Sequence, residues 1–189
     1  MARTLWWGLA TVWALGAILQ AAEENSAVPQ HLRGKPDKLF HRVNNKLVEA
    51  PPELTQLAQT YPFFGSKGKT VKGRRITIMA EKTRYKLGET VRIIHVLEAV
   101  EQGVELYVMG PKPVFDELLD GQNLNPLPKK TDVYDGKVVK GPAVDFNYDI
   151  THLTFTQPGK HTIQWQGGGH TSEGPLGLKS NVLTVEIVE

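Results

Sequence analysis

The sequence predicts an all-β fold, an antiparallel β-sandwich of about seven to nine strands that follows a mostly irregular N-terminal extension. Three observations support this prediction. Short runs of β-branched and aromatic residues recur from Arg74 to the end of the chain. Turn residues separate these runs, and almost no stretch has the apolar period of a helix.

The strands can be justified in order along the predicted domain at 74–189. The first run alternates and places Ile76 and Ile78 on one face, whereas 82–89 has the composition of a turn. The run at 90–99 is apolar on both faces, as expected of a central strand. Further strands are expected at 104–110, 150–156, 160–166 and 181–188, and Asp135-Gly136 within 131–140 predicts a two-residue hairpin.

The extension at 23–73 is polar and basic. Residues 28–75 contain ten Lys or Arg against three acidic residues, a net charge of +7, whereas residues 76–189 contain eleven against fifteen, a net charge of −4. Such a basic arm could contact an anionic surface, or it could serve only as a solubilising extension.

Within the extension, two prolines followed by apolar residues on one side predict a short helix at 52–60. The rest is expected to be poorly ordered or draped on the domain. We therefore expect residues 23–70 to contribute little to the stability of the domain and more to salt-sensitive binding.

Residues 1–22 predict a secretory signal peptide. Arg3 provides the positive start, 5–19 provides an uncharged apolar stretch, and small residues follow it. Cleavage is expected near Ala21 or Ala22, which would make the protein secreted or periplasmic. The alternative is an uncleaved signal anchor, although the stretch is shorter than the roughly 20 residues that span a bilayer as a helix.

The chain contains no cysteine. This composition excludes disulfides, thiolate metal sites and a cysteine nucleophile, so an exported domain would depend on its core alone. No later stretch is long and apolar enough to span a membrane, and no nucleic-acid reader motif is present.

Three motifs resemble those of macroglobulin-type and bacterial immunoglobulin-like domains. "YKLGETVRIIHVLE" resembles the opening of their strand B, "LTFTQPGKHTIQW" resembles their E–F corner, and "LKSNVLTVEI" resembles their last strand. The resemblance covers roughly 74–189 and implies an immunoglobulin-like sandwich. The chain departs from antibody-type domains because it lacks both cysteines and places Trp165 on the sixth strand. Many functions occur on this fold, so the resemblance implies no particular one.

His152, His161 and His170 recur every nine residues, a spacing that invites a metal site. Strand geometry argues against it. His152 is out of phase with the core-facing Phe155, whereas His161 shares the inward parity of Ile163, so the first two histidines face opposite sides of their sheets. His170 lies past the far end of the strand that His161 opens, about 20 Å away at roughly 3.3 Å per residue. We predict no metal and no cofactor.

Two histidines are expected to have structural roles. His161 sits where sandwiches commonly place a corner tyrosine, and it could bond back to the chain in the same way. His95 is expected to be a core histidine bonded to backbone. The two together are the only pair that remains open as a metal site, and a poor one without a nearby carboxylate.

Asp145, Asn147 and Asp149 recur at every second position, which suggests an oxygen-ligand calcium site. They do not fit an EF-hand loop. The simpler interpretation is a solvated polar face opposite Phe146 and Tyr148.

The glycine-rich loop at 166–180 is the first candidate binding surface, because long, mobile loops at one end of a sandwich often carry ligands. Within it, His170, Thr171 and Glu173 are the predicted binding residues.

The excursion at 109–144 is the second candidate, since it is long for a connection within a compact domain. Its apolar residues, with Phe115 and Leu118 as the predicted contacts, either cover a sandwich edge or present an apolar patch to a partner. Arg74 and Arg75, at the end of the basic arm, complete the predicted binding residues.

We therefore expect an exported, non-catalytic module that binds another protein or an envelope component. Its serines lie in polar loops without a nucleophile elbow, and the glycine loop lacks the order of a phosphate-binding motif, so we do not expect an enzyme. The alternatives are a carrier of a small ligand or metal, and a hydrolase whose site the sequence does not reveal.

Overall fold

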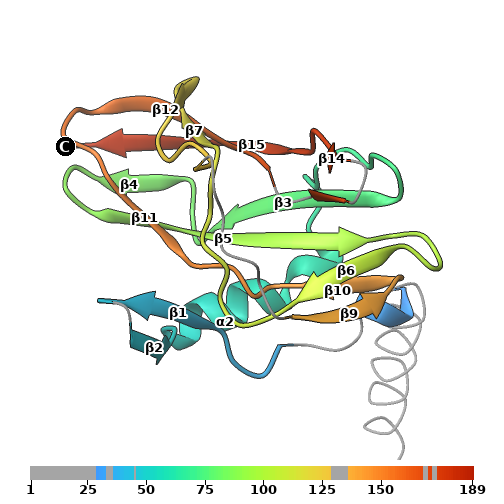
Figure 1. Ribbon diagram of the computed structural model, residues 1–189. Helices are drawn as coiled ribbons and strands as arrows, with labels where there is room; N and C mark the ends of the chain where they lie inside the picture. The colour runs from blue at the N-terminus through green and yellow to red at the C-terminus, as the bar shows by residue number, and fades with distance from the viewer. Residues whose placement is uncertain (1–28, 33–35, 45, 129–135, 168–169, 172–173) are drawn as a thin grey trace, which may run out of the picture.

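The computed structural model describes residues 29–32, 36–44, 46–128, 136–167, 170–171 and 174–189. Strands predominate in this part of the chain and most pair antiparallel, which confirms an all-β fold. Two sheets lie face to face in a sandwich-like arrangement, and the N-terminal elements form a further layer beneath them (Figure 1).

The first sheet is built around β5 (Thr90–Ala99). β3 (Arg74–Ala80) pairs with one edge of β5, while β10 (Ala143–Asp145) and β11 (Thr151–Thr154) pair with successive parts of the other edge. All three pairings are antiparallel. Most of β5 is buried, because both faces of this strand are covered, as its apolar sequence predicts.

The second sheet has the order β4-β15-β12-β7-β8. Its strands are β4 (Arg84–Lys86), β15 (Lys179–Val188), β12 (Gly159–Gln166), β7 (Glu117–Leu119) and β8 (Gln122–Asn123). β4 pairs parallel with β15, so the segment predicted as a turn contains a short edge strand. β7 and β8 come from the long excursion, which therefore extends the edge of this sheet beside β12.

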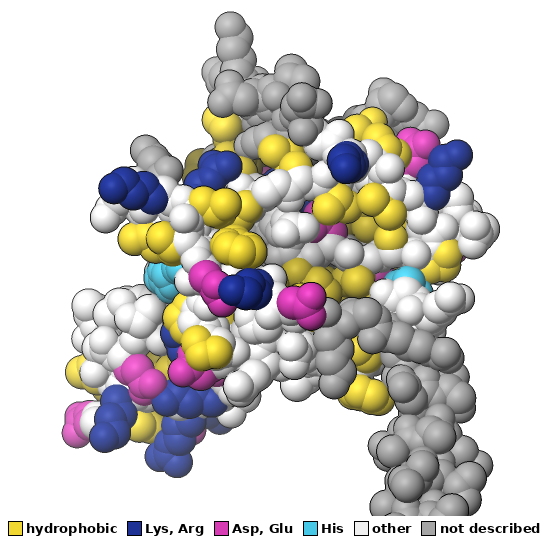
Figure 2. Space-filling view, turned by 90° about the horizontal axis from the view of Figure 1, so that it is seen from below, with side chains coloured by type: hydrophobic (Ala, Val, Ile, Leu, Met, Phe, Trp, Pro, Cys, Tyr) yellow, Lys and Arg dark blue, Asp and Glu magenta, His cyan; other side chains and the backbone are white. Residues whose placement is uncertain are grey.

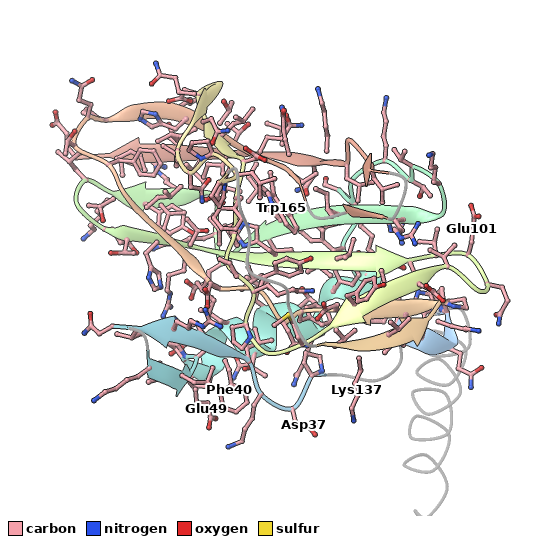
Figure 3. The ribbon with its side chains drawn as sticks, viewed as in Figure 1. Asp37, Phe40, Glu49, Glu101, Lys137 and Trp165 are labelled. Atoms are coloured by element: carbon pink, nitrogen blue, oxygen red, sulfur yellow. The ribbon has the colours of Figure 1, made fainter. Side chains whose placement is uncertain are left out.

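The main core lies between the two sheets. Val91 and Ile93 of β5 pack in one cluster with Ile163 and Trp165 of β12, and each is at most 1% exposed. Trp165 lies between the layers in Figure 3. The alternation of inward and outward residues along both strands produces this core, as a period of two requires.

The described part of the segment before β3 forms a layer with regular elements, so the prediction of a largely irregular extension is confirmed only in part. η1 (Gln30–Leu32), a short 3₁₀ turn, precedes a hairpin of β1 (Phe40–Val43) and β2 (Lys46–Glu49). The helix predicted at 52–60 lies at α2 (Pro52–Gln59), and a second 3₁₀ turn, η2 (Tyr61–Phe63), follows it.

This layer has its own apolar core against the outer face of the first sheet. Leu54, Ala58 and Tyr61 are fully buried and share a cluster with Met79 and Ile94 of the sheet. Because large buried side chains contribute roughly 1.5–3 kcal/mol each, the expectation that this segment adds little stability conflicts with the structure.

Two short ribbons complete the described structure. β6 (Glu105–Val108) pairs with β9 (Lys137–Lys140), and β13 (His170–Thr171) pairs with β14 (Gly174–Pro175). The hairpin predicted at Asp135-Gly136 has its first strand outside the described residues, and its second strand pairs with β6.

No helix in the described ranges is long and apolar enough to cross a membrane. The predicted signal peptide at 1–22, with its cleavage near Ala21 or Ala22, lies outside the described residues.

Candidate functional site

An open hollow of about 780 Å³ lies where the N-terminal layer meets the first sheet. It combines apolar and polar groups around one buried carboxylate, that of Glu98. The lining residues are Pro29, Gln30, His31, Thr70, Arg75, Glu98, Val100, Gln102 and Pro142.

Glu98 is 1% exposed and accepts four hydrogen bonds. Arg75, its direct partner across the β3–β5 ladder, donates from Nε at 2.6 Å and from Nη2 at 3.0 Å. The Tyr61 hydroxyl of η2 donates at 2.6 Å, and His31 Nε2 of η1 donates at 2.8 Å. Four segments that are distant in sequence therefore meet at one carboxylate.

These bonds determine the charge state of the site. Burial alone would raise the pKa of the Glu98 carboxyl, but the hydrogen bonds from Arg75, Tyr61 and His31 outweigh burial and hold this pKa below its usual range. Burial, reinforced by the nearby charge of Glu98, raises the pKa of the Tyr61 hydroxyl. Burial also lowers the pKa of Lys67, whose ammonium lies 4.2 Å from the centre of the Tyr61 ring.

The hydrogen bonds around Glu98 leave this carboxylate unable to act as a base. Each carboxylate oxygen of Glu98 accepts two hydrogen bonds, so neither oxygen has a lone pair left to take up a proton. Among the residues that line the hollow, no hydrogen bond joins a nucleophilic side chain to a base. The floor is a rigid ionic network, and the neutral side chains around it remain available to a ligand.

The structure places the predicted Arg74 and Arg75 differently from each other. Arg75 belongs to the Glu98 network and also lines the hollow. The guanidinium of Arg74 donates to the backbone carbonyl of Glu105, from Nε at 3.1 Å and from Nη2 at 2.9 Å. In Figure 2, the face seen from below carries basic, acidic and apolar side chains, and several of the basic ones gather at its lower left beside acidic ones.

Phe115 and Leu118 lie at the edge of the second sheet, away from the hollow. Both are half-buried, and Leu118 is opposite Gln164 in the β7–β12 ladder. The backbone carbonyl of Phe115 accepts a hydrogen bond from Trp165 Nε1 at 3.0 Å. These contacts favour the edge-covering interpretation over an exposed apolar patch.

His170 and Thr171 form β13, and their side chains are not described. Glu173 lies outside the described residues. No described contact therefore brings His170, Thr171 or Glu173 to the hollow.

The histidines have carboxylate partners that the sequence did not reveal. His95, expected to bond to backbone, instead contacts the Glu117 carboxylate at 3.0 Å from Nε2, and both side chains are fully buried. His161 Nδ1 donates to Asp120 at 2.7 Å, and its Nε2 lies 3.4 Å from the backbone carbonyl of Gln157, as the corner interpretation expects.

No group of three metal-ligating side chains converges among the described residues. His152 stacks edge-on against His41 of the N-terminal layer, with ring centres 5.7 Å apart. His161 packs on the core residue Phe155 instead, so these two histidines lie on opposite sides, as parity predicts.

Asp145 and its neighbours do not form a solvated face, which corrects that prediction. Asp145 is 1% exposed and pairs with the ammonium of Lys112. Its other oxygen accepts two hydrogen bonds from Asn147, both at 2.8 Å. Asp149 instead accepts a bond from the backbone of Arg42 at 3.2 Å, so the three residues do not share a cation-binding position.

Sequence reasoning missed the network around Glu98. One signal was available, because Glu98 is the only acidic residue in the mostly apolar run at 90–99. A buried carboxylate in a central strand requires a partner. The segment that contains Tyr61 and His31 was predicted to be irregular, so these residues could not be predicted as the partners of Glu98.

The chain matches no protein-family model. Neither the curated proteins nor the solved structures contain a match to it.

Proposed function

We propose that the protein is an exported, non-catalytic binding module that takes a segment of a partner protein or envelope component into the hollow above Arg75 and Glu98. One observation carries this proposal: the hollow is open and lined by both polar and apolar groups, and its floor is a fully bonded ionic network that is already in place. A preorganised surface of this kind loses little entropy when a ligand binds.

The chemistry of the lining indicates what the hollow would accept. Gln30, Thr70 and Gln102 offer neutral donors and acceptors, while Pro29 and Pro142 offer flat apolar surface. Neutral hydrogen-bonding groups beside proline surface suit the amides of a polypeptide or the hydroxyls of a glycan better than a strongly charged ligand.

A small-ligand carrier is the second candidate. The volume of the hollow falls within the roughly 300–1,000 Å³ typical of ligand sites. Such sites usually enclose most of their ligand, however, and this hollow is open, which favours part of a larger partner.

The immunoglobulin-like class is part of the proposal. The order β3-β5-β11 in one sheet and β15-β12-β7 in the other matches the A-B-E and G-F-C order of immunoglobulin sandwiches. The step from β11 to β12 crosses between the sheets at Pro158-Gly159, where the sequence motif resembles an E–F corner.

Export is supported by the apolar stretch at 5–19. Expression in a secreting host, followed by mass determination of the exported chain, tests it directly. Export of a chain that begins near Glu23 is the expected result, and a chain retained in the membrane with Met1 intact would contradict it.

Site-specific photo-crosslinking tests the binding surface. A photoreactive residue at Gln102, on the rim of the hollow, is expected to crosslink a partner from an extract of the source organism. The control position for the photoreactive residue is Val182, which is 53% exposed on β15 of the other sheet. A second variant, Thr70→Trp, should obstruct the hollow and lower the yield of the Gln102 adduct without changing the melting temperature. Equal adducts at both positions, or an unchanged adduct yield in Thr70→Trp, would refute the hollow as the site.

A further inference from the structure

The ribbon of β6 and β9 is joined to the β5–β10 pair and folds back beneath the first sheet (Figure 1). β5 leads into β6 through the insertion at 100–103, and β9 leads into β10 through Gly141-Pro142. The Gly141 N–H donates to the carbonyl of Val104 at 2.6 Å and links the two halves. The ribbon therefore has two edges of its own, and it packs on the main core through Leu106 of β6.

The phase of the hydrogen bonds identifies which groups face those edges. In an antiparallel pair, bonded and non-bonded residue pairs alternate. Since Gly141 bonds to Val104, the next pairs that exchange bonds are Leu106 with Val139 and Val108 with Lys137. The backbone groups of the intervening residues point outward instead, and these residues are Glu105, Tyr107, Val138 and Lys140.

The outward carbonyls of β6 are already hydrogen-bonded to side chains. The carbonyl of Glu105 accepts from the guanidinium of Arg74, and the carbonyl of Tyr107 accepts from Lys112 Nζ at 3.0 Å. The alternation of bonded pairs directs both of these carbonyls outward, so the two contacts independently support the assignment of the outward-facing residues.

The outer edge of β9 is open within the part of the chain that the structure describes. No described group bonds to the backbone of Val138 or Lys140, and all four β9 side chains are exposed. Neither Lys137 nor Lys140 forms an ion pair with a described residue. Lys137 points away from the body of the molecule in Figure 3.

We propose that β9 accepts an extended segment of an acidic partner protein as an added antiparallel strand. Two outward N–H and C=O pairs provide the main-chain bonds that strand addition requires. Lysines at both ends of Lys-Val-Val-Lys select a strand with the complementary pattern acid-apolar-apolar-acid, because opposite charges facing each other across a ladder are favourable.

A second copy of this chain is a poorer occupant than an acidic strand. Two β9 edges would bring four lysines together, and lysines on an open edge discourage exactly such pairing between copies. The proposed surface adjoins the hollow, since only Gly141 separates Pro142 from the end of β9, but it does not depend on binding there.

Fluorescence anisotropy with the full chain and labelled peptides tests the proposal. The probe is a 12-residue peptide with Glu-Ile-Val-Glu at its centre, and the matched peptides carry Gln-Ile-Val-Gln or Lys-Ile-Val-Lys. The Glu peptide is expected to bind about tenfold more tightly than the Gln peptide, the effect of roughly two exposed ion pairs. This difference should vanish near 1 M salt, where screening is nearly complete.

Two variants separate charge from strand pairing. Lys137→Glu combined with Lys140→Glu should reverse the preference toward the Lys peptide. Val138→Pro removes an outward N–H without removing a bond to β6, and it should abolish binding of every peptide, whereas Val138→Thr should retain it.

Equal affinity for the Glu and Gln peptides would overturn the proposal, as would normal binding to Val138→Pro. Sedimentation that shows a dimer dissociated by Val138→Pro would also overturn it, by identifying a second copy as the occupant. None of these outcomes bears on the crosslinking at Gln102, so the two proposals can fail separately.

Discussion

Truncating Leu54 to alanine should destabilise the whole domain, although this residue lies in the segment that the sequence predicted to contribute little to stability. Leu54 is 0% exposed on α2 and packs in the cluster that covers the outer face of the first sheet. Leu→Ala removes three carbon groups, about 2.4 kcal/mol at roughly 0.8 kcal/mol per buried group, and a cavity adds to the loss. We expect the free energy of unfolding to fall by about 3–4 kcal/mol.

Leu57→Ala is the matched control. It makes the same chemical change one turn along the same helix, where the side chain is only partly buried. Helix propensity changes equally in both variants, so their difference isolates burial. The control should lose less than about 1.5 kcal/mol.

Urea unfolding followed by tryptophan fluorescence suits this test. From Glu23 onward the chain contains one tryptophan, Trp165, which lies in the main core and not in the N-terminal layer. A lower midpoint with an unchanged slope, reported by Trp165, would show that the layer and the sandwich unfold together.

The reasoning would be refuted if Leu54→Ala left the Trp165 transition within about 0.5 kcal/mol of the parent. That result would place this layer outside the cooperative unit. An equal loss in Leu54→Ala and Leu57→Ala would also contradict it, because burial would then not explain the change.

Three further predictions concern buried and corner carboxylates. Tyr61→Phe should cost about 1.5–2 kcal/mol at pH 7, the strength of a bond to a charged group. Because hydrogen bonds hold the folded pKa of Glu98 below its unfolded value of about 4.3, the stabilisation from this carboxylate is complete above that value and is lost as pH falls through the folded pKa. Urea titrations should therefore show the stability difference between the parent and Tyr61→Phe narrowing as pH falls below about 4.3. Glu117→Ala should cost about 3–5 kcal/mol, and Glu117→Leu with His95→Leu should restore most of it; a double variant as unstable as Glu117→Ala would contradict this. Asp120→Asn at the half-exposed corner should cost no more than about 1 kcal/mol, and thermal melts at pH 7 that show a larger loss would argue for a role beyond the exposed ion pair.

The amino-acid sequence alone was enough to predict the strand class, the central strand and the sides on which residues lie. Period-two alternation places Ile76 and Ile78 in the core, and it separates His152 from His161, because side-chain direction along a strand depends only on local backbone geometry. The short helix at α2 was also readable, since prolines at a first turn and apolar residues one turn apart are local signals.

The place of the N-terminal segment over the first sheet becomes apparent only in the folded chain. Nothing local in the segment indicates that it covers Met79 and Ile94, because coverage is a property of the sheet face that is left open. The same holds for Glu98, whose partners Tyr61 and His31 precede it by 37 and 67 residues. Periodicity reports which way a side chain points, but the group that meets it there is set by chain topology, and topology brings together segments whose sequences carry no mark of each other.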